Sequence, residues 1–267
     1  MSINNILIDA CPKDNLDLLL DCVGDLNRRL NSRLSGVSYA WPNASPLGAL
    51  MTSPLTAVRD ESLMTAAIAG ARQAFRFAFA EISPDANWCE GIGEPKDLIL
   101  DHLYTADLLA TIEVTSSPCA QADPIDLAVP SGTPVLRIKH GVRDMSLNTV
   151  VIAWKDCASA ARALRASRAL LAFAQHIKVI GVGDEVSFER LEQIAAFLTR
   201  DGLKAEAEHL PKTHSNPGDD IMRHALATQA DLVVSGVKGA RSLRERLLGN
   251  VTDKLSTYAG FSWFMCA

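Results

Sequence analysis

Short apolar runs alternate with amphipathic stretches along the first half of the chain. Residues 5–9 and 108–114 have the length and composition of buried strands, and between residues 16 and 30 leucines and valines recur at helical spacing. Alternation of strands and helices predicts a parallel sheet with helices on both faces and right-handed crossovers. The pattern predicts strands at 5–9, 34–41, 87–90, 108–114 and 133–138, and helices at 16–30, at 57–81 and from Pro95 onward.

The same alternation begins again near residue 149. It predicts strands at 149–154, 178–182, 204–210, 232–235 and 262–266, and helices at 160–174, 188–200 and 219–228. Some letters repeat as well: Pro95-x-Asp97-x-Ile99-x-x-His102 matches Pro217-x-Asp219-x-Ile221-x-x-His224, and Ala-Asp-Leu follows at 106–108 and 230–232. A match at fixed spacing in both halves indicates an internal duplication. The sequence therefore predicts two α/β domains with five-stranded parallel sheets, at 1–141 and 148–267, and the repeated histidines favour helix packing over catalysis.

Composition and charge narrow the class of protein. With 267 residues, 48% of them hydrophobic and 21% charged, the chain is long enough for two core-forming domains. No apolar run reaches the roughly 18 residues of a membrane span, and the first residues lack a signal-peptide pattern, so we expect a cytoplasmic protein with no membrane partner. A net charge of −5 argues against nucleic acid. The six cysteines are scattered, without metal-ligand spacing, so we expect reduced thiols and no metal site.

One stretch, residues 230–252, has the pattern of a small-molecule site. The apolar run 232–234 leads into Gly236 and Gly239, and Gly249-Asn250 follows after nine further residues. Glycines where a strand ends and where a helix begins let the backbone fold closely around a phosphate. Charge favours the same half, because residues 1–147 hold 11 Lys and Arg against 18 Asp and Glu, and the remainder holds 15 against 13. The second half is therefore expected to bind an anionic ligand more readily than the first.

Two structures are compatible with the end of this stretch. A continuous helix over 242–259 would bury one leucine-rich face, but Gly249 inside it costs about 1 kcal/mol relative to alanine. Alternatively, a helix begins at Asn250 as N-cap and ends at Gly260. We prefer the second structure, which directs the amides of Asn250, Val251 and Thr252 at an anion.

These motifs resemble the universal stress protein family in its tandem, two-domain form. Family members carry G-x-x-G, nine residues, then G-(S/T), and here Gly236-x-x-Gly239 is followed at that spacing by Gly249-Asn250. The segments VVIAWKDCASAARAL, GNVTDKL and SGTPVLRI are also similar to the family's first strand and helix, G-G-V-T variant and last strand. The resemblance implies the adenine nucleotide alpha hydrolase-like, Rossmann-like fold with strand order 3-2-1-4-5. It implies a ligand between strands 1 and 4 at their carboxyl ends, which is ATP or another adenine nucleotide (AMP or ADP) with or without Mg²⁺, unless the motif has been lost.

The predicted binding residues depart from the family pattern at two positions. Asn250 replaces the family's Ser or Thr, so that Thr252 would have to supply any hydroxyl contact, and Lys155 stands where many members have an Asp. Lys155 either pairs with a phosphate or is a solvated loop charge, and the residues do not decide between these. The first half has no glycine in the corresponding loop, 115–126, and is expected to lack a site. The predicted site comprises Ala153, Trp154, Lys155, Asp156, Val182, Gly236, Lys238, Gly239, Arg241, Gly249, Asn250, Val251 and Thr252.

Three functional hypotheses follow. The leading one is an adenine-nucleotide-binding stress protein with a regulatory role and at most slow ATP hydrolysis. The second is an interaction or dimerisation module that has lost its nucleotide. The third is an enzyme with a catalytic group near 153–157, where Cys157 has no activating base nearby in sequence. For assembly, we expect the fifth strands of the two halves to pair within the chain, with homodimerisation as a further step.

Overall fold

The strands and helices follow one another in the predicted order. The computed structural model describes residues 2–41, 54–114, 117, 119–214, 216–238 and 260–267, with backbone only for 54–60. The first half contains β1 (Asn5–Asp9), α1 (Leu16–Leu30), β2 (Arg33–Ala40), α3 (Pro54–Phe79), β3 (Asn87–Ile92), α4 (Pro95–Leu103), β4 (Leu108–Ile112), α5 (Pro124–Ser131) and β5 (Val135–Ile138). The second contains β6 (Thr149–Ala153), α6 (Ala158–Leu171), β7 (His176–Val182), the 3-10 turn η1 (Gly183–Glu185), α7 (Phe188–Arg200), β8 (Ala205–Leu210), α8 (Pro217–Ala227), β9 (Leu232–Gly236) and β10 (Ser262–Cys266).

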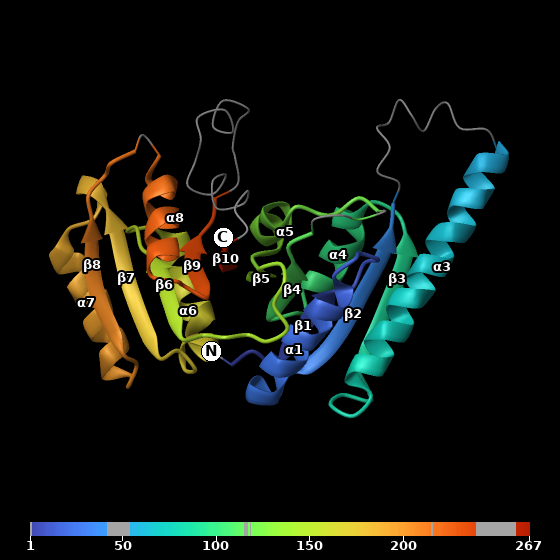
Figure 1. Cartoon of the computed structure of the whole chain (residues 1–267), viewed down its shortest axis with the longest axis horizontal. Helices are drawn as coiled ribbons and strands as arrows, with labels where there is room; N and C mark the ends of the chain where they lie inside the picture. The colour runs from blue at the N-terminus through green and yellow to red at the C-terminus, as the bar shows by residue number, and fades with distance from the viewer. Residues whose placement is uncertain (1, 42–53, 115–116, 118, 215, 239–259) are drawn as a thin grey trace.

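All ten strands form one sheet, in the order β3-β2-β1-β4-β5-β10-β9-β6-β7-β8 (Figure 1). Within each half the order is 3-2-1-4-5 and every pair is parallel, which confirms the predicted fold class. The sequence placed the element boundaries within a few residues of those observed. The fold therefore consists of two doubly wound units in tandem, each with the reversal of strand order that creates a binding crevice.

The two half-sheets join through β5 and β10, the one antiparallel pair among the described strands. Trp263 lies opposite Arg137 in this pair, with the guanidinium 5.5 Å from the ring centre. The indole N–H of Trp263 donates to Ser235 Oγ at 2.8 Å, which ties the junction to the strand that ends at the predicted site. The expected pairing of the fifth strands inside one chain is therefore confirmed.

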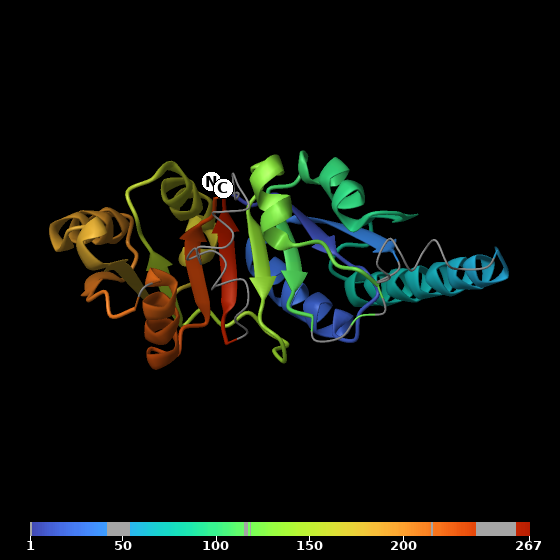
Figure 2. The same cartoon turned by 90° about the horizontal axis from the view of Figure 1, so that it is seen from above.

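Helices cover both faces of the sheet. Residues of α1, α3, α6 and α7 pack against one face, and residues of α4, α5 and α8 pack against the other. Helix α3 lies at the β3 edge of the sheet and extends past it (Figure 2). Within the described residues, no helix is long and apolar enough to cross a membrane.

Candidate functional site

A cavity of about 250 Å³ lies at the carboxyl ends of β6, β7 and β9. Strands β6 and β9 are hydrogen-bonded neighbours, and the chain order reverses between them. This is the place where ligands bind in open α/β sheets. Of the predicted site residues, six line the cavity: Ala153, Trp154, Lys155, Val182, Gly236 and Lys238.

Asp156 differs from its predicted neighbours, because it is not among the residues that line this cavity. Its Oδ1 accepts hydrogen bonds from Trp154 Nε1 and from Arg190 Nε, each at 2.9 Å. The hydrogen bond from Arg190 is the main reason why the pKa of Asp156 lies below its ordinary value. The carboxylate thus fixes the Trp154 ring and joins the loop after β6 to α7.

The other six predicted site residues lie outside the described residues: Gly239, Arg241, Gly249, Asn250, Val251 and Thr252. The segment 242–259, with its two alternative helices, lies outside them as well. The described wall of the cavity is formed by β6, β7, β9 and the helices next to them.

Gly236 is packed against the first turn of α6. A Cβ on Gly236 would lie 2.4 Å from the backbone nitrogen of Ala160 and 2.6 Å from both the carbonyl carbon and Oγ of Ser159. No side chain fits at that distance without moving the helix. The glycine was predicted to allow close approach of a ligand; the contact that the structure shows at this position is with α6.

Two helices begin at the cavity. Cys157 is the N-cap of α6, and Asn216 is the N-cap of α8 with Pro217 in its first turn; all three line the cavity. Asn216 accepts a hydrogen bond from the amide of Gly218 at 2.8 Å. Because helix N-termini carry partial positive charge, two of them beside one cavity favour an anionic ligand. The sequence analysis did not predict either helix N-terminus as part of the site, although Asn216-Pro217 is a typical pattern at the start of a helix.

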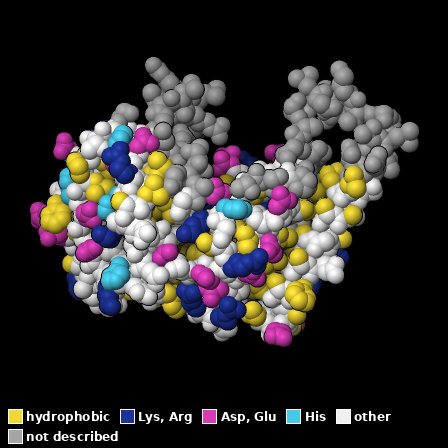
Figure 3. All heavy atoms as spheres, viewed as in Figure 1, with side chains coloured by type: hydrophobic (Ala, Val, Ile, Leu, Met, Phe, Trp, Pro, Cys, Tyr) yellow, Lys and Arg dark blue, Asp and Glu magenta, His cyan; other side chains and the backbone are white. Residues whose placement is uncertain are grey.

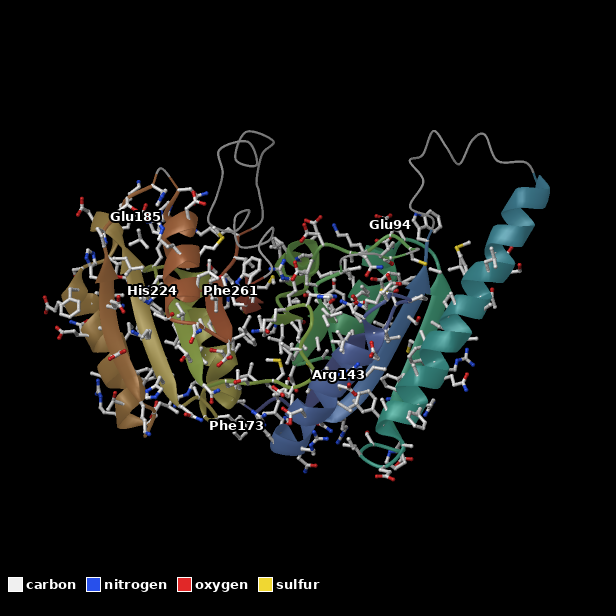
Figure 4. All side chains as sticks on the ribbon, in the orientation of Figure 1. Glu94, Arg143, Phe173, Glu185, His224 and Phe261 are labelled. Carbon is white, nitrogen blue, oxygen red and sulfur yellow. The ribbon has the colours of Figure 1, made fainter. Side chains whose placement is uncertain are left out.

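Charged side chains stand at the edge of the cavity. Lys155 forms an ion pair with Glu185, which follows β7, and both side chains are more than half exposed. Figure 4 shows Glu185 at the same end of the sheet as the start of α8. Lys238 is exposed and follows β9. Burial alone would raise the pKa of Cys157, but the hydrogen bond with Ser159 and the first-turn amides lower it, with a further contribution from the charge of Lys238.

The inner wall is apolar. Ile180 is fully buried, and Trp154, Val182 and Ile221 are each less than a tenth exposed. These side chains form a surface suited to a flat hydrophobic group next to the charged edge. On the face seen in Figure 3, acidic and basic side chains are interspersed over the described residues, without a continuous basic surface.

The first half fills the corresponding position with its own side chains. Strand register places Asp9 where the second half has Ala153, and places Tyr39 where it has Val182. Tyr39 is fully buried, and Asp9 forms a buried ion pair with Lys13 at 3.2 Å. The second half therefore has small residues where the first half has a phenol and an ion pair.

Comparison with known proteins agrees with this geometry. The model of the universal stress protein family matches residues 149–261. A universal stress protein from Archaeoglobus fulgidus superposes with a TM-score of 0.77 at 16% identity, over 99% of this chain and 96% of that one. A putative universal stress protein from Pseudomonas aeruginosa gives 0.63 at 14% identity, over 99% and 93%. A functionally unknown protein from P. aeruginosa gives 0.59 at 16% identity, over 99% and 92%.

These comparisons have different weight. No curated protein matches the chain in sequence. The structural matches have low identity and support the fold over the whole length, while the family model identifies the second half. The resemblance to tandem universal stress proteins predicted from the sequence is confirmed.

Proposed function

We propose that the universal stress protein domain in the second half of this chain binds an adenine nucleotide in the cavity between β6 and β9. The binding domain is taken as residues 148–267, and residues 1–141 form a companion domain without a nucleotide site. The role is regulatory, in a stress response, with ATP, ADP or AMP as the ligand, with or without Mg²⁺. At most, slow ATP hydrolysis accompanies binding.

The observation that carries the proposal is the convergence of two helix N-termini and two lysines on one cavity at the reversal of strand order. Amides at helix N-termini and ammonium groups recognise phosphate. The apolar wall of Ile180, Val182 and Ile221 is suited to a purine ring. The described residues thus fit both ends of a nucleotide.

The glycine motif supplies the rest of the proposed site. Gly239, Arg241 and the segment 249–252 follow β9 in sequence, and Gly236 at the end of β9 lines the cavity. The proposal assigns the phosphate contacts to these residues together with Lys155 and Lys238. This part is supported by the sequence motif and by the position of β9.

Isothermal titration of the purified chain with ATP, ADP and AMP, with and without Mg²⁺, tests the proposal. We expect binding detectable at about 10⁻⁴ M protein, which corresponds to about −5 kcal/mol. Val182→Tyr, which copies Tyr39 of the first half, should fill the cavity and abolish binding. Phe188→Tyr, at a half-exposed position outside the lining residues, is the matched control.

Two results would reject the proposal. The absence of heat with every nucleotide would reject nucleotide binding, and equal binding by the Val182→Tyr variant and the wild type would reject this cavity as the binding site. The first result would favour the alternative, a tandem module that serves interaction alone. That alternative already has one supporting observation, since Tyr39, Asp9 and Lys13 occupy the equivalent position in the first half.

A further inference from the structure

A second hollow lies on the other side of Trp154, between α6 and α7. It is an open groove of about 500 Å³, separate from the nucleotide cavity but sharing Trp154 and Cys157 with it. The two helices lie on the same face of the sheet. The groove is lined chiefly by Trp154, Leu164, Arg165, Arg190, Ile194 and Phe197.

The floor of this α6–α7 groove is apolar. Trp154, Leu164 and Ile194 are each at most 9% exposed, and their side chains form its base. Phe197 stands at its edge with 40% of its surface exposed. A partly exposed phenylalanine beside an apolar floor is the usual composition of a surface that receives a bulky side chain from a partner.

The rim is basic. Helix α6 carries Arg162, Arg165 and Arg168 and no Asp or Glu. Arg162 donates to the carbonyl oxygen of Ala267, and Arg168 donates to Asp201. Arg165 is exposed and has no hydrogen bond or ion pair with the residues that the structure describes.

Arg190 provides a second cation on the opposite helix. Its Nε donates to Asp156 and its Nη1 donates to Gln193, which uses two of the five N–H donors of a guanidinium. Asp156 is the one carboxylate among the described lining residues, and its ion pair with Arg190 leaves the charge of Arg165 unbalanced in the lining. The groove therefore offers the charge of Arg165 on one side of an apolar floor and the remaining N–H donors of Arg190 on the other.

We propose that the α6–α7 groove docks an acidic peptide segment of a partner protein. The segment would place a leucine or phenylalanine on the floor beside Phe197 and its carboxylates against Arg165 and Arg190. Charge complementarity argues for an acidic partner. The open, helix-bounded shape suits a peptide, and the apolar floor does not suit a sugar–phosphate backbone.

The test uses fluorescence anisotropy of a labelled 12-residue peptide built from Glu, Ala, Leu and Phe, without nucleotide so that its result is independent of the cavity. Two comparison peptides replace either all Glu by Gln or all Leu and Phe by Ser. We expect each replacement to weaken binding by about tenfold or more, since both the charges and the apolar anchor contribute. Higher salt should weaken the acidic peptide alone.

Arg165→Glu and Phe197→Ala should each weaken the acidic peptide by about tenfold. Arg200→Glu is the matched control, because Arg200 is exposed on α7 and outside the lining of the groove. Circular dichroism and urea unfolding check that each variant is folded. Equal binding of the Gln peptide, an unchanged affinity for Arg165→Glu, or no binding at millimolar peptide would overturn the proposal. So would self-association of the chain that Arg165→Glu abolishes, because the occupant would then be a second copy.

Discussion

The end of β9 touches the start of α6 at Gly236, where an added Cβ would lie 2.4 Å from the nitrogen of Ala160. Gly236→Ala must therefore displace α6 or β9, and we expect it to lower the free energy of unfolding by about 1–3 kcal/mol. Urea denaturation measures this. Gly70→Ala is the control, because nothing lies within 4 Å of a Cβ there, and in the middle of α3 it should stabilise by about 0.5–1 kcal/mol. Equal stability of Gly236→Ala and the wild type would contradict the tight contact.

Repeated letters in the sequence correspond to repeated contacts. Asp231 Oδ2 accepts from the amide of Thr149 at 3.1 Å, and Asp107 Oδ2 accepts from the amides of Asn4 and Asn5 at 2.8 and 3.0 Å. Each carboxylate fixes the start of the first strand of its half. This explains why periodicity and the Ala-Asp-Leu repeat predicted the strands, the helices and the duplication, since these arise from local patterning and from one supersecondary unit used twice. The strand order within each half came from the family resemblance instead.

The site was less predictable because it depends on contacts between distant elements. The family resemblance pointed to Lys155 and Asp156 but not to their partners, Glu185 and Arg190, which are 30 and 34 residues away. In the same way, nothing in the local pattern shows that Gly236 meets α6. Such contacts form when distant segments pack together, and local sequence patterns do not reveal them.

Lys155 is the first cavity residue to test. Its ion pair with Glu185 is exposed, so replacing either residue should change the free energy of unfolding by less than about 1 kcal/mol. If the cavity binds a nucleotide, Lys155→Ala should weaken affinity about tenfold by removing a charge-assisted contact. Glu185→Gln should strengthen it about threefold, because Lys155 then has no competing carboxylate. Titration calorimetry measures both, and weaker binding by Glu185→Gln would contradict this role.

Cys157 should be more reactive than the other thiols with a shifted pKa, because its pKa alone among them is lowered. Burial alone would raise its pKa, but the hydrogen bond with Ser159, first-turn amides and the charge of Lys238 lower it. Burial raises the pKa of Cys11 and of Cys22 to about 12. At neutral pH iodoacetamide should therefore alkylate Cys157 before those two, as mass spectrometry of peptides would show. Lys238→Met should slow the reaction, and faster labelling of Cys11 would refute the assignment.

Asp220 should make stability depend on acid pH. Burial alone would raise its pKa, but hydrogen bonds from Thr213 and His214 lower it to about 2. The folded pKa thus lies below that of the unfolded chain, near 3.9. The contribution of this group is present above about pH 4 and is lost as pH falls toward 2. Urea midpoints of Asp220→Asn should vary less than wild-type midpoints over this range, and parallel curves would contradict the linkage.

The first half has a buried ion pair at the position where the second half has its cavity, and the contribution of this pair to stability can be measured. Lys13 Nζ lies 3.2 Å from Asp9 Oδ2, neither side chain is more than 6% exposed, and Thr111 Oγ1 donates to the same oxygen at 2.9 Å. Burial alone would raise the pKa of Asp9, but the Lys13 charge and these hydrogen bonds lower it.

Lys13→Met leaves that carboxylate buried without its counter-charge, so it should cost about 3–5 kcal/mol of unfolding free energy. Asp9→Asn together with Lys13→Met removes both charges and should cost clearly less than Lys13→Met alone. Urea unfolding of the two single variants and the double variant completes the cycle. Additive losses would mean that the two charges do not stabilise each other. The packing of Tyr39 would then be the main stabilising interaction at this position of the first half.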